Sequence, residues 1–172
     1  MTVAVTDELL GELVAGSWAE GTFALAVAAA IEHDEQILLI GPLGNDFEPI
    51  WQLPSGLVLP GETLLDALHR VVSLTSGLSI RDVTGYRGHH DQFVGGEVVR
   101  TFVFSVTVTD PKRICKSAYI GHRWSSEPIT DSLVVTELPA SPSGHTTTPA
   151  QPGFNRSADL GHLKRQARQK PP

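Results

Sequence analysis

The apolar positions near the start of the chain recur with helical spacing. These positions are Leu9, Leu10, Leu13 and Val14. Thr6 precedes them and can cap the first turn, while Asp7 stands where a negative charge favours the beginning of a helix. Residues 1–19 are therefore predicted to contain a short docking helix with one apolar face, which Gly16 ends.

Two apolar runs after this helix predict a β-hairpin. The runs are TFALAVAAAI at 22–31 and QILLIG at 36–41, and they flank the polar sequence EHDE. This arrangement is typical of two buried strands joined by a tight turn. A further short strand is predicted at Trp51–Leu53. The prolines and glycines of residues 54–61 then indicate a loop.

A second amphipathic pattern follows this loop. From Glu62 onward the apolar residues, among them Leu65, Leu68 and Val72, recur at helical spacing. Ser76 and Gly77 end the pattern, and glycine is the residue that most often terminates a helix. Residues 62–76 are therefore predicted to form a helix with one buried face.

The second half of the chain consists mainly of predicted strands. VGGE separates two runs, LSIRDVTGYRGHHDQF and VVRTFVFSVTV, and in the second run Phe102, Phe104 and Val106 alternate with their neighbours. AYIGHRW predicts a last strand, whereas ITDSLVVTEL at 129–138 fits either a short helix or an edge strand. The mixture of helices and strands predicts the α/β class.

Charge divides the chain into an acidic body and a basic tail. Residues 1–139 carry eight Lys and Arg against eighteen Asp and Glu, whereas residues 140–172 carry five against one. The tail has few large apolar residues, so burial cannot offset the entropy of ordering it. We predict one folded domain at 20–139, preceded by the docking helix and followed by a disordered tail. Nucleic acid is not an expected partner, because basic tails are commonly just solvated.

The residues that report on compartment favour the cytoplasm. Cys115 has no second cysteine with which to form an internal disulfide. The N-terminal residues lack the basic start and unbroken apolar core of a signal peptide. No run of about 20 apolar residues occurs that could span a bilayer, so no membrane partner is expected.

One stretch of the chain carries a long motif with fixed spacing. The motif is G-x5-E-x7-R-E-U-x-E-E-x-G-U, in which U is a bulky aliphatic residue. It is matched without a gap at Gly56, Glu62, Arg70, Val72, Gly77 and Leu78. This motif is the signature of the Nudix superfamily, and WQLPSG at 51–56 is similar to the W-x-L-P-G-G of that family. The resemblance covers about residues 20–138 and implies an α/β/α sandwich built on a mixed β-sheet.

The chain departs from the signature where the family places its metal ligands. In Nudix hydrolases the glutamate after the box arginine and an adjacent pair further on bind Mg²⁺ or Mn²⁺. Here these positions are Val71, Leu74 and Thr75. Helix positions i, i+3 and i+4 share one face, so three carboxylates there would make the oxygen cage that a divalent ion requires. Two aliphatic groups and one hydroxyl cannot.

Glu62 and Arg70 remain from the box. The resemblance implies that Glu62 lies near the metal and that Arg70 orients the acidic cluster. One interpretation is structural, with Glu62 paired to Arg70. In the other, Glu62 belongs to a rebuilt Mg²⁺ or Mn²⁺ site with further carboxylates, for which the candidates are Asp66, Asp91 and Glu97. We favour the structural interpretation and expect neither a metal nor another cofactor unless such a site exists.

Other polar and aromatic residues are candidates for metal-free chemistry or binding. His89 and Asp91 would share one face of a strand and could act as acid and base, while His90 points away. Strand histidines are also common on plain surfaces. Trp51 and Trp124 could stack on a base, although such tryptophans are often core residues. The candidate catalytic residues are Glu62, Arg70, His89 and Asp91, and the candidate ligand-binding residues are Trp51, Gly56, Val71, Leu74, Thr75, Arg87 and Arg100, the two arginines for a phosphate.

Three functions remain compatible with these observations. The preferred one is a Nudix-fold protein whose Mg²⁺-dependent hydrolysis of nucleoside diphosphate derivatives is lost or severely reduced. Its pocket would be reused to bind a small molecule, or to carry out metal-free chemistry on one. The alternatives are an active Nudix hydrolase with a rebuilt metal site and a non-catalytic nucleotide-sensing or interaction module. The expected partner is a small-molecule ligand, with nucleotides and diphosphates as candidates, and a homodimer is an open expectation.

Overall fold

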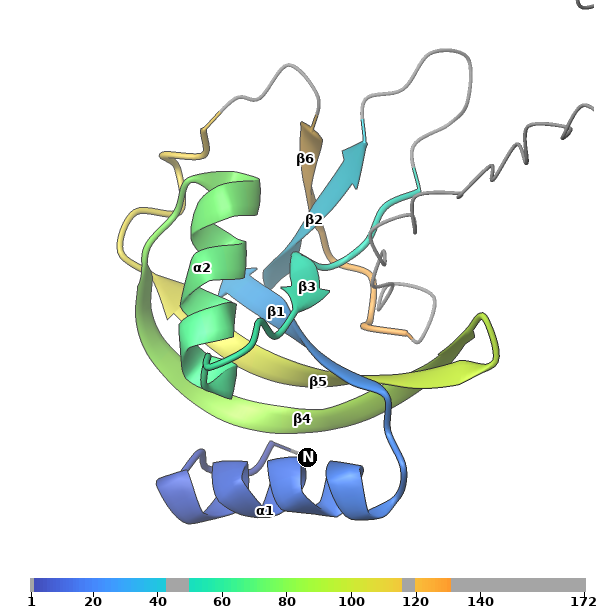
Figure 1. Cartoon of the computed structure of the whole chain (residues 1–172). Helices are drawn as coiled ribbons and strands as arrows, with labels where there is room; N and C mark the ends of the chain where they lie inside the picture. The colour runs from blue at the N-terminus through green and yellow to red at the C-terminus, as the bar shows by residue number, and fades with distance from the viewer. Residues whose placement is uncertain (1, 43–49, 116–119, 131–172) are drawn as a thin grey trace, which may run out of the picture. The chain divides into compact units, whose positions relative to one another are not determined.

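The computed structural model describes residues 2–42, 50–115 and 120–130 (Figure 1). Its elements are α1 (Asp7–Ala19), β1 (Ala24–His33), β2 (Gln36–Pro42), β3 (Ser55–Leu57), α2 (Leu64–Ser76), β4 (Ile80–Val94), β5 (Glu97–Val108) and β6 (Ile120–Ser125). The basic tail and residues 131–138 of the ambiguous segment lie outside the described residues. No helix within the described ranges is both long enough and apolar enough to cross a membrane.

A six-stranded mixed sheet is the centre of the fold. Its strand order is β4-β5-β1-β2-β6, and β3 pairs with β1. β1 runs parallel to β5, whereas the other paired strands are antiparallel. In Figure 1, β4 and β5 form the long curved pair of strands at one edge of the sheet. The α/β class and the mixed sheet predicted from the sequence are confirmed.

The β1–β2 hairpin has the predicted turn, but its strands separate beyond it. Asp34 and Glu35 lie in the left-handed region, with φ of 48° and 60°, as a two-residue hairpin turn requires. The register of β1 with β2 joins Glu32 to Ile37 and His33 to Gln36, next to this turn. Further along, β1 pairs with β3 and β5, and β2 pairs with β6.

The strand predicted at Trp51–Leu53 is misplaced. Gln52 exchanges two backbone hydrogen bonds of 2.8 Å with Ile40, as an isolated bridge. Pro54 has no N–H group and cannot extend a ladder, and its carbonyl accepts from Ala29 at 2.8 Å. Regular pairing therefore begins after the proline, in β3, where the sequence had indicated a loop.

α2 has a specific cap at each end. Thr63 is the N-cap, and its side chain and that of Asp66 each accept from the other's backbone amide as a capping box. Gly77 ends the helix with φ of 70°, which confirms the predicted C-terminus. The helix begins after the predicted Glu62 because Thr63 supplies the cap.

The main core lies between α2 and one face of the sheet. Its buried side chains include Val27 and Ile31 of β1, Phe102, Phe104 and Val106 of β5, and Leu64, Leu68 and Val72 of α2. The predicted alternation in β5 is confirmed. Thr101 and Val103, which point to the other face, are also buried, so β5 is covered on both faces.

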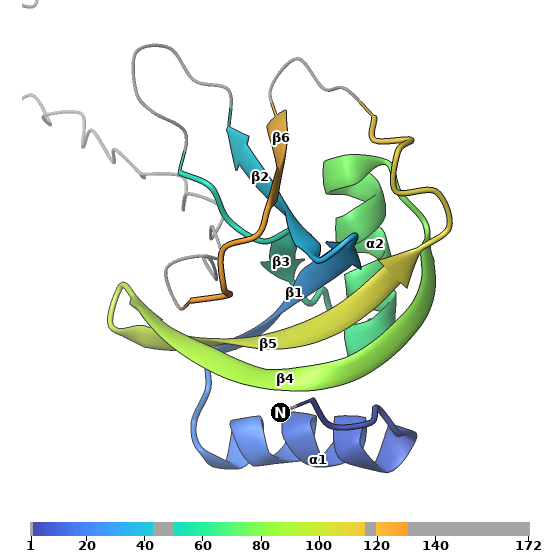
Figure 2. The ribbon, with the colours of Figure 1, turned by 180° about the vertical axis from the view of Figure 1, so that it is seen from behind.

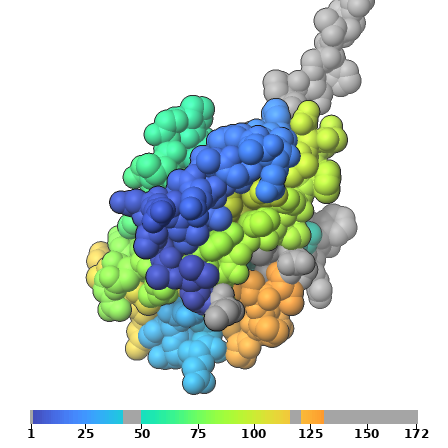
Figure 3. Space-filling model, turned by 90° about the horizontal axis from the view of Figure 1, so that it is seen from below, coloured from blue at the N-terminus to red at the C-terminus, as the bar shows by residue number. Residues whose placement is uncertain are grey.

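A helix forms within residues 1–19 as predicted, and this helix, α1, is longer than predicted. Leu10, Leu13 and Val14 pack against the main core. The helix lies beside β4 in both ribbon views (Figure 2), and Figure 3 shows it as a blue surface next to the yellow-green surface of β4. The prediction that Gly16 ends the helix is wrong, because the left-handed glycine is Gly21, with φ of 78°. An internal glycine costs about 1 kcal/mol, which packing of the apolar face offsets.

Candidate functional site

β3 and α2 meet at Gly56 and Val71. Gly56 pairs with Val27 in the sheet, and Val71 is buried in the main core. A Cβ built on Gly56 would lie 2.8 Å from Cγ2 of Val71, which is closer than two carbon atoms pack. Glycine therefore permits this contact, and the Val71 methyl groups fill the space beside the Gly56 backbone.

Glu62 and Arg70 form a bidentate ion pair at the beginning of α2. Nε and Nη2 of Arg70 donate to the Glu62 carboxylate at 2.6 and 2.8 Å, and Nη2 also donates to the Leu57 carbonyl at 2.7 Å. The Leu59 amide donates to Glu62 at 2.9 Å. Hydrogen bonds from Arg70 and then Leu59 lower the pKa of Glu62 to about 2, and the pair raises the pKa of Arg70. The predicted pairing is confirmed.

The other two box positions differ from Val71 in their surroundings. Leu74 is 72% exposed. The Thr75 hydroxyl donates to the Val71 carbonyl at 2.8 Å. The Thr75 carbonyl lies 3.0 Å from Nε2 of His122 in β6, and because a carbonyl oxygen only accepts, the histidine is the donor. His122 was not among the sequence candidates, since no spacing rule connects it with α2.

Trp51 and Trp124 contribute to different clusters. Trp51 packs against the smaller cluster formed by Ala28, Leu39, Leu53 and Val103. The guanidinium carbon of Arg123 lies 4.9 Å from the centroid of the Trp51 ring, in a cation–π contact. Trp124 packs against the main core, and its ring meets His33 edge-on at 5.7 Å. Stacking of either tryptophan on a base stays a prediction.

Asp91 belongs to a charge network around Arg100. Arg100 is 8% exposed, and its Nε and Nη2 both donate to Asp91 at 2.7 Å, while Nη1 donates to Glu20 at 2.6 Å. Hydrogen bonding to Arg100 lowers the pKa of Asp91. His89 instead packs its ring edge-on against Phe102 at 6.3 Å. Their joint role as acid and base stays a prediction, and these contacts favour a structural role for Asp91.

Arg87 and Arg100 point to opposite faces of the sheet. Arg87 Nε donates to the Ser105 hydroxyl at 2.5 Å, and its guanidinium pairs with Glu32. Ser105 and Arg100 are separated by an odd number of positions in β5, and strand side chains alternate between faces. The fold therefore does not bring the two arginines together, and each already has an acidic partner.

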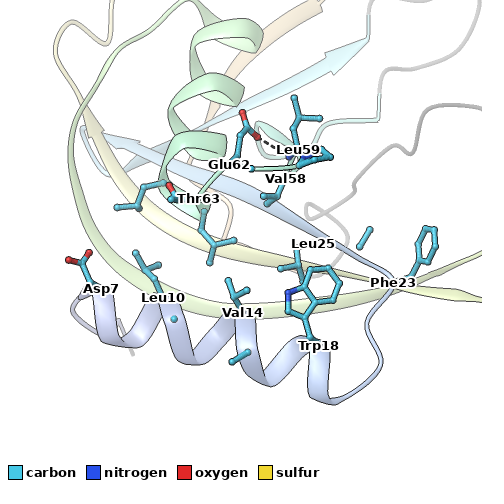
Figure 4. Close-up of a pocket in the computed structure, with 17 residues that line it drawn as sticks. Asp7, Leu10, Val14, Trp18, Phe23, Leu25, Val58, Leu59, Glu62 and Thr63 are labelled. Carbon is cyan, nitrogen blue, oxygen red and sulfur yellow. Dashed lines mark hydrogen bonds between the residues drawn. The ribbon is translucent and has the colours of Figure 1, made fainter.

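A cavity of about 900 Å³ lies between α1 and the loop that joins β3 to α2. Figure 4 shows Leu10, Val14 and Trp18 pointing from α1 toward this loop. Glu62 is the one sequence candidate in its lining, and its carboxylate points away from α1 (Figure 4). Sequence reasoning missed the cavity because its two walls are far apart in the chain. The sequence feature that pointed to the cavity was Trp18, an aromatic residue beyond the predicted end of the helix.

The described residues do not fit the Mg²⁺ or Mn²⁺ that the resemblance implies. Such ions take most of their ligands from carboxylates, carbonyls and water. In the part of the chain that the structure describes, no three His, Cys, Asp or Glu side chains are grouped so as to hold a metal ion. The residue after Arg70 is Val71, whose side chain ends in methyl groups and has no oxygen to offer a metal. The Glu62 oxygens already accept hydrogen bonds from Arg70 and Leu59.

Comparison with known proteins identifies related folds. No family model matches the chain. A NUDIX hydrolase from Nitrosomonas europaea is 27% identical, and the match covers 60% of this chain and 72% of that protein with a TM-score of 0.50. A UDP-X diphosphatase is 19% identical, with a TM-score of 0.54 over 76% of this chain and 66% of that one. The second likeness shows the fold alone.

One curated relative is similar in sequence. An ADP-ribose pyrophosphatase of Methanocaldococcus jannaschii is 34% identical over 87 residues, which cover 49% of this chain and 51% of the relative. The chain thus spans about half the length of that relative.

Proposed function

Because the chain has the fold of the Nudix hydrolases, we propose that it is a Nudix-fold protein that binds a small molecule and has lost, or almost lost, metal-dependent diphosphate hydrolysis. The contact between Val71 and Gly56 carries this proposal. In the family, a glutamate after the box arginine binds the metal. Here a buried valine stands at that position and packs against the glycine backbone, so the site offers methyl groups where a cation needs oxygen atoms.

The charges near the box support the same proposal. Glu62 keeps its family position, but its carboxylate is held by Arg70 and by the Leu59 amide. A carboxylate that accepts three hydrogen bonds and pairs with a cation gains little from binding a second cation. Arg70, in turn, has lost the acidic cluster that it orients in the family and serves to fasten the loop to α2.

The alternative is an active hydrolase with a rebuilt metal site, and the 34% identity with an ADP-ribose pyrophosphatase favours it. It requires carboxylates from outside the box to supply the ligands. ADP-ribose is therefore the first substrate to test, followed by other nucleoside diphosphate sugars, dinucleotides, nucleoside triphosphates and isoprenoid diphosphates.

A turnover screen separates the two candidates. The full chain and a Glu62→Gln variant are incubated with each compound, with and without Mg²⁺ or Mn²⁺, and products are measured by mass spectrometry. We expect no metal-dependent product above the Glu62→Gln background for any compound. Turnover at ordinary enzymatic rates that needs the metal and disappears in Glu62→Gln would establish the active hydrolase instead. Circular dichroism shows whether both proteins are folded.

A further inference from the structure

We propose that the cavity between α1 and the β3–α2 loop is a binding site, which takes a small ligand with an apolar, preferably aromatic, body and a neutral or cationic polar end. This site goes beyond the function proposed above, because it does not use the contact between Gly56 and Val71. Its walls are the apolar side of α1 and the loop residues from Val58 to Leu65.

The size of the cavity suits a drug-sized molecule. Ligand pockets are commonly about 300–1,000 Å³ and are lined mainly by apolar and aromatic groups. This cavity measures about 900 Å³. Leu10, Val14, Leu25 and Val58 form its floor and sides, and they also belong to or pack against the main core, so the walls are held by the fold.

Large apolar side chains at the cavity are left in solvent. Trp18 is 52% exposed, Phe23 61% and Leu59 49%. Each of them lines the cavity, and Figure 4 shows Trp18 and Phe23 near the same end of it. Burial of apolar surface stabilises by about 25 cal/mol per Å². A ligand that covers these three side chains would gain this free energy.

The charges of the lining select against anions. Its charged residues are Asp7 and Glu62, and it contains no Lys, Arg or His. The carboxylate of Glu62 is already held by Arg70, which leaves Asp7 to meet a ligand. All charged residues of α1 are acidic. A phosphate would therefore be repelled here, whereas an ammonium group would be attracted.

Three matched probes test both the site and its charge preference. They share a naphthalene body and differ in the polar end: 2-naphthylmethylammonium, 2-naphthylmethanol and 2-naphthyl phosphate. Isothermal titration calorimetry with the full chain measures each affinity. We expect the ammonium and the alcohol to bind and the phosphate to bind at least about tenfold more weakly, which corresponds to about 1.4 kcal/mol. Equal affinity for the phosphate, or no binding of any probe, would overturn the proposal.

Two glycines of α1 supply a matched pair of variants. Gly11 lines the cavity and Gly16 does not, and a Cβ on either residue would have no neighbouring heavy atom within 4 Å. Replacing a helical glycine also removes its unfavourable helix propensity, so both variants should fold. We expect Gly11→Leu to weaken binding of the ammonium probe at least about tenfold, because the new side chain fills the cavity. Gly16→Leu should bind like the wild type.

The same variants distinguish a ligand site from an interface between two copies of the chain. Sedimentation velocity should give one species of unchanged size for the wild type, Gly11→Leu and Gly16→Leu. Equal probe affinity in Gly11→Leu and Gly16→Leu would overturn the proposal. A wild-type dimer that Gly11→Leu converts to a monomer would also overturn it, because the cavity would then be filled by a second copy. Ala15→Leu, at an exposed lining residue, repeats the test at another position.

Discussion

The Glu62 carboxylate is joined to the Arg70 guanidinium by hydrogen bonds of 2.6 and 2.8 Å. Arg70 also donates to the Leu57 carbonyl, and Glu62 accepts from the Leu59 amide. The pair therefore closes the loop between β3 and α2 at both sides. Since that loop forms one wall of the cavity described above, the ion pair between Glu62 and Arg70 holds this wall in place.

This pair makes the stability of the protein depend on acid pH. The pKa of Glu62 is lowered from 4.5 to about 2 in the folded protein. A lowered carboxyl pKa stabilises the fold above the unfolded pKa, and this stabilisation disappears as the pH falls through the folded pKa. We expect the difference in melting temperature between wild type and Glu62→Gln to be constant above about pH 5 and to shrink between about pH 4.5 and pH 2. Thermal unfolding followed by circular dichroism measures it, and a difference that grows on acidification would contradict this assignment.

Gly56 and Val71 are expected to be energetically coupled. Gly56→Ala places a methyl group 2.8 Å from Cγ2 of Val71, and overpacking of this kind costs about 1–3 kcal/mol. Val71→Ala removes the opposing methyl groups and leaves a cavity, at a cost of about 1–3 kcal/mol. In the double variant the new methyl group has room. The free energy of unfolding should therefore fall by at least about 0.5 kcal/mol less than the sum of the two single-variant losses. Urea unfolding of the wild type, the two single variants and the double variant gives the four free energies of this double-mutant cycle. Additive losses of stability would show that the two residues are not in repulsive contact.

Local sequence rules were sufficient for the parts of the fold that depend on neighbouring residues. The turn at EHDE, the alternation in β5 and the end of α2 at Gly77 are all set by short-range geometry, and all three are found as predicted. The predicted helix began two residues too early, at Glu62, because the apolar spacing does not show that Thr63 and Asp66 form the capping box.

The errors arose where distant segments decide the outcome. Gly16 would end an isolated helix, but the packing of α1 against the main core carries the helix past it. β3 forms because β1 and β2 separate and leave β1 available for pairing with it. No local sequence pattern predicts this separation. The cavity and the contact from His122 to α2 likewise join segments far apart in the chain.

The two acidic partners of Arg100 should contribute unequally to stability. Asp91 accepts two hydrogen bonds from Arg100, and its side chain is 32% exposed. Glu20 accepts one hydrogen bond from Arg100, and its side chain is 63% exposed. Asp91→Asn leaves the buried guanidinium with one solvated partner, and we expect a loss of about 2–3 kcal/mol. Glu20→Gln should cost less than about 1 kcal/mol. Urea unfolding measures both free energies, and a larger loss in Glu20→Gln would reverse the assignment.

Restoring the box carboxylates should create a metal-dependent stability that the wild type lacks. In the variant Val71→Glu, Leu74→Glu, Thr75→Glu, the first glutamate replaces a side chain that is 3% exposed, and burying an unpaired charge is costly. The variant should therefore melt below the wild type without metal and gain several degrees in millimolar Mg²⁺, because an ion that binds the folded state alone stabilises it. Differential scanning fluorimetry measures the shift. The matched control is Leu74→Glu, Thr75→Glu, which retains Val71 and changes a mostly exposed part of the helix. An equal Mg²⁺ shift in the wild type would mean that the existing residues already bind the metal, and the proposed loss of hydrolysis would then lose its physical basis.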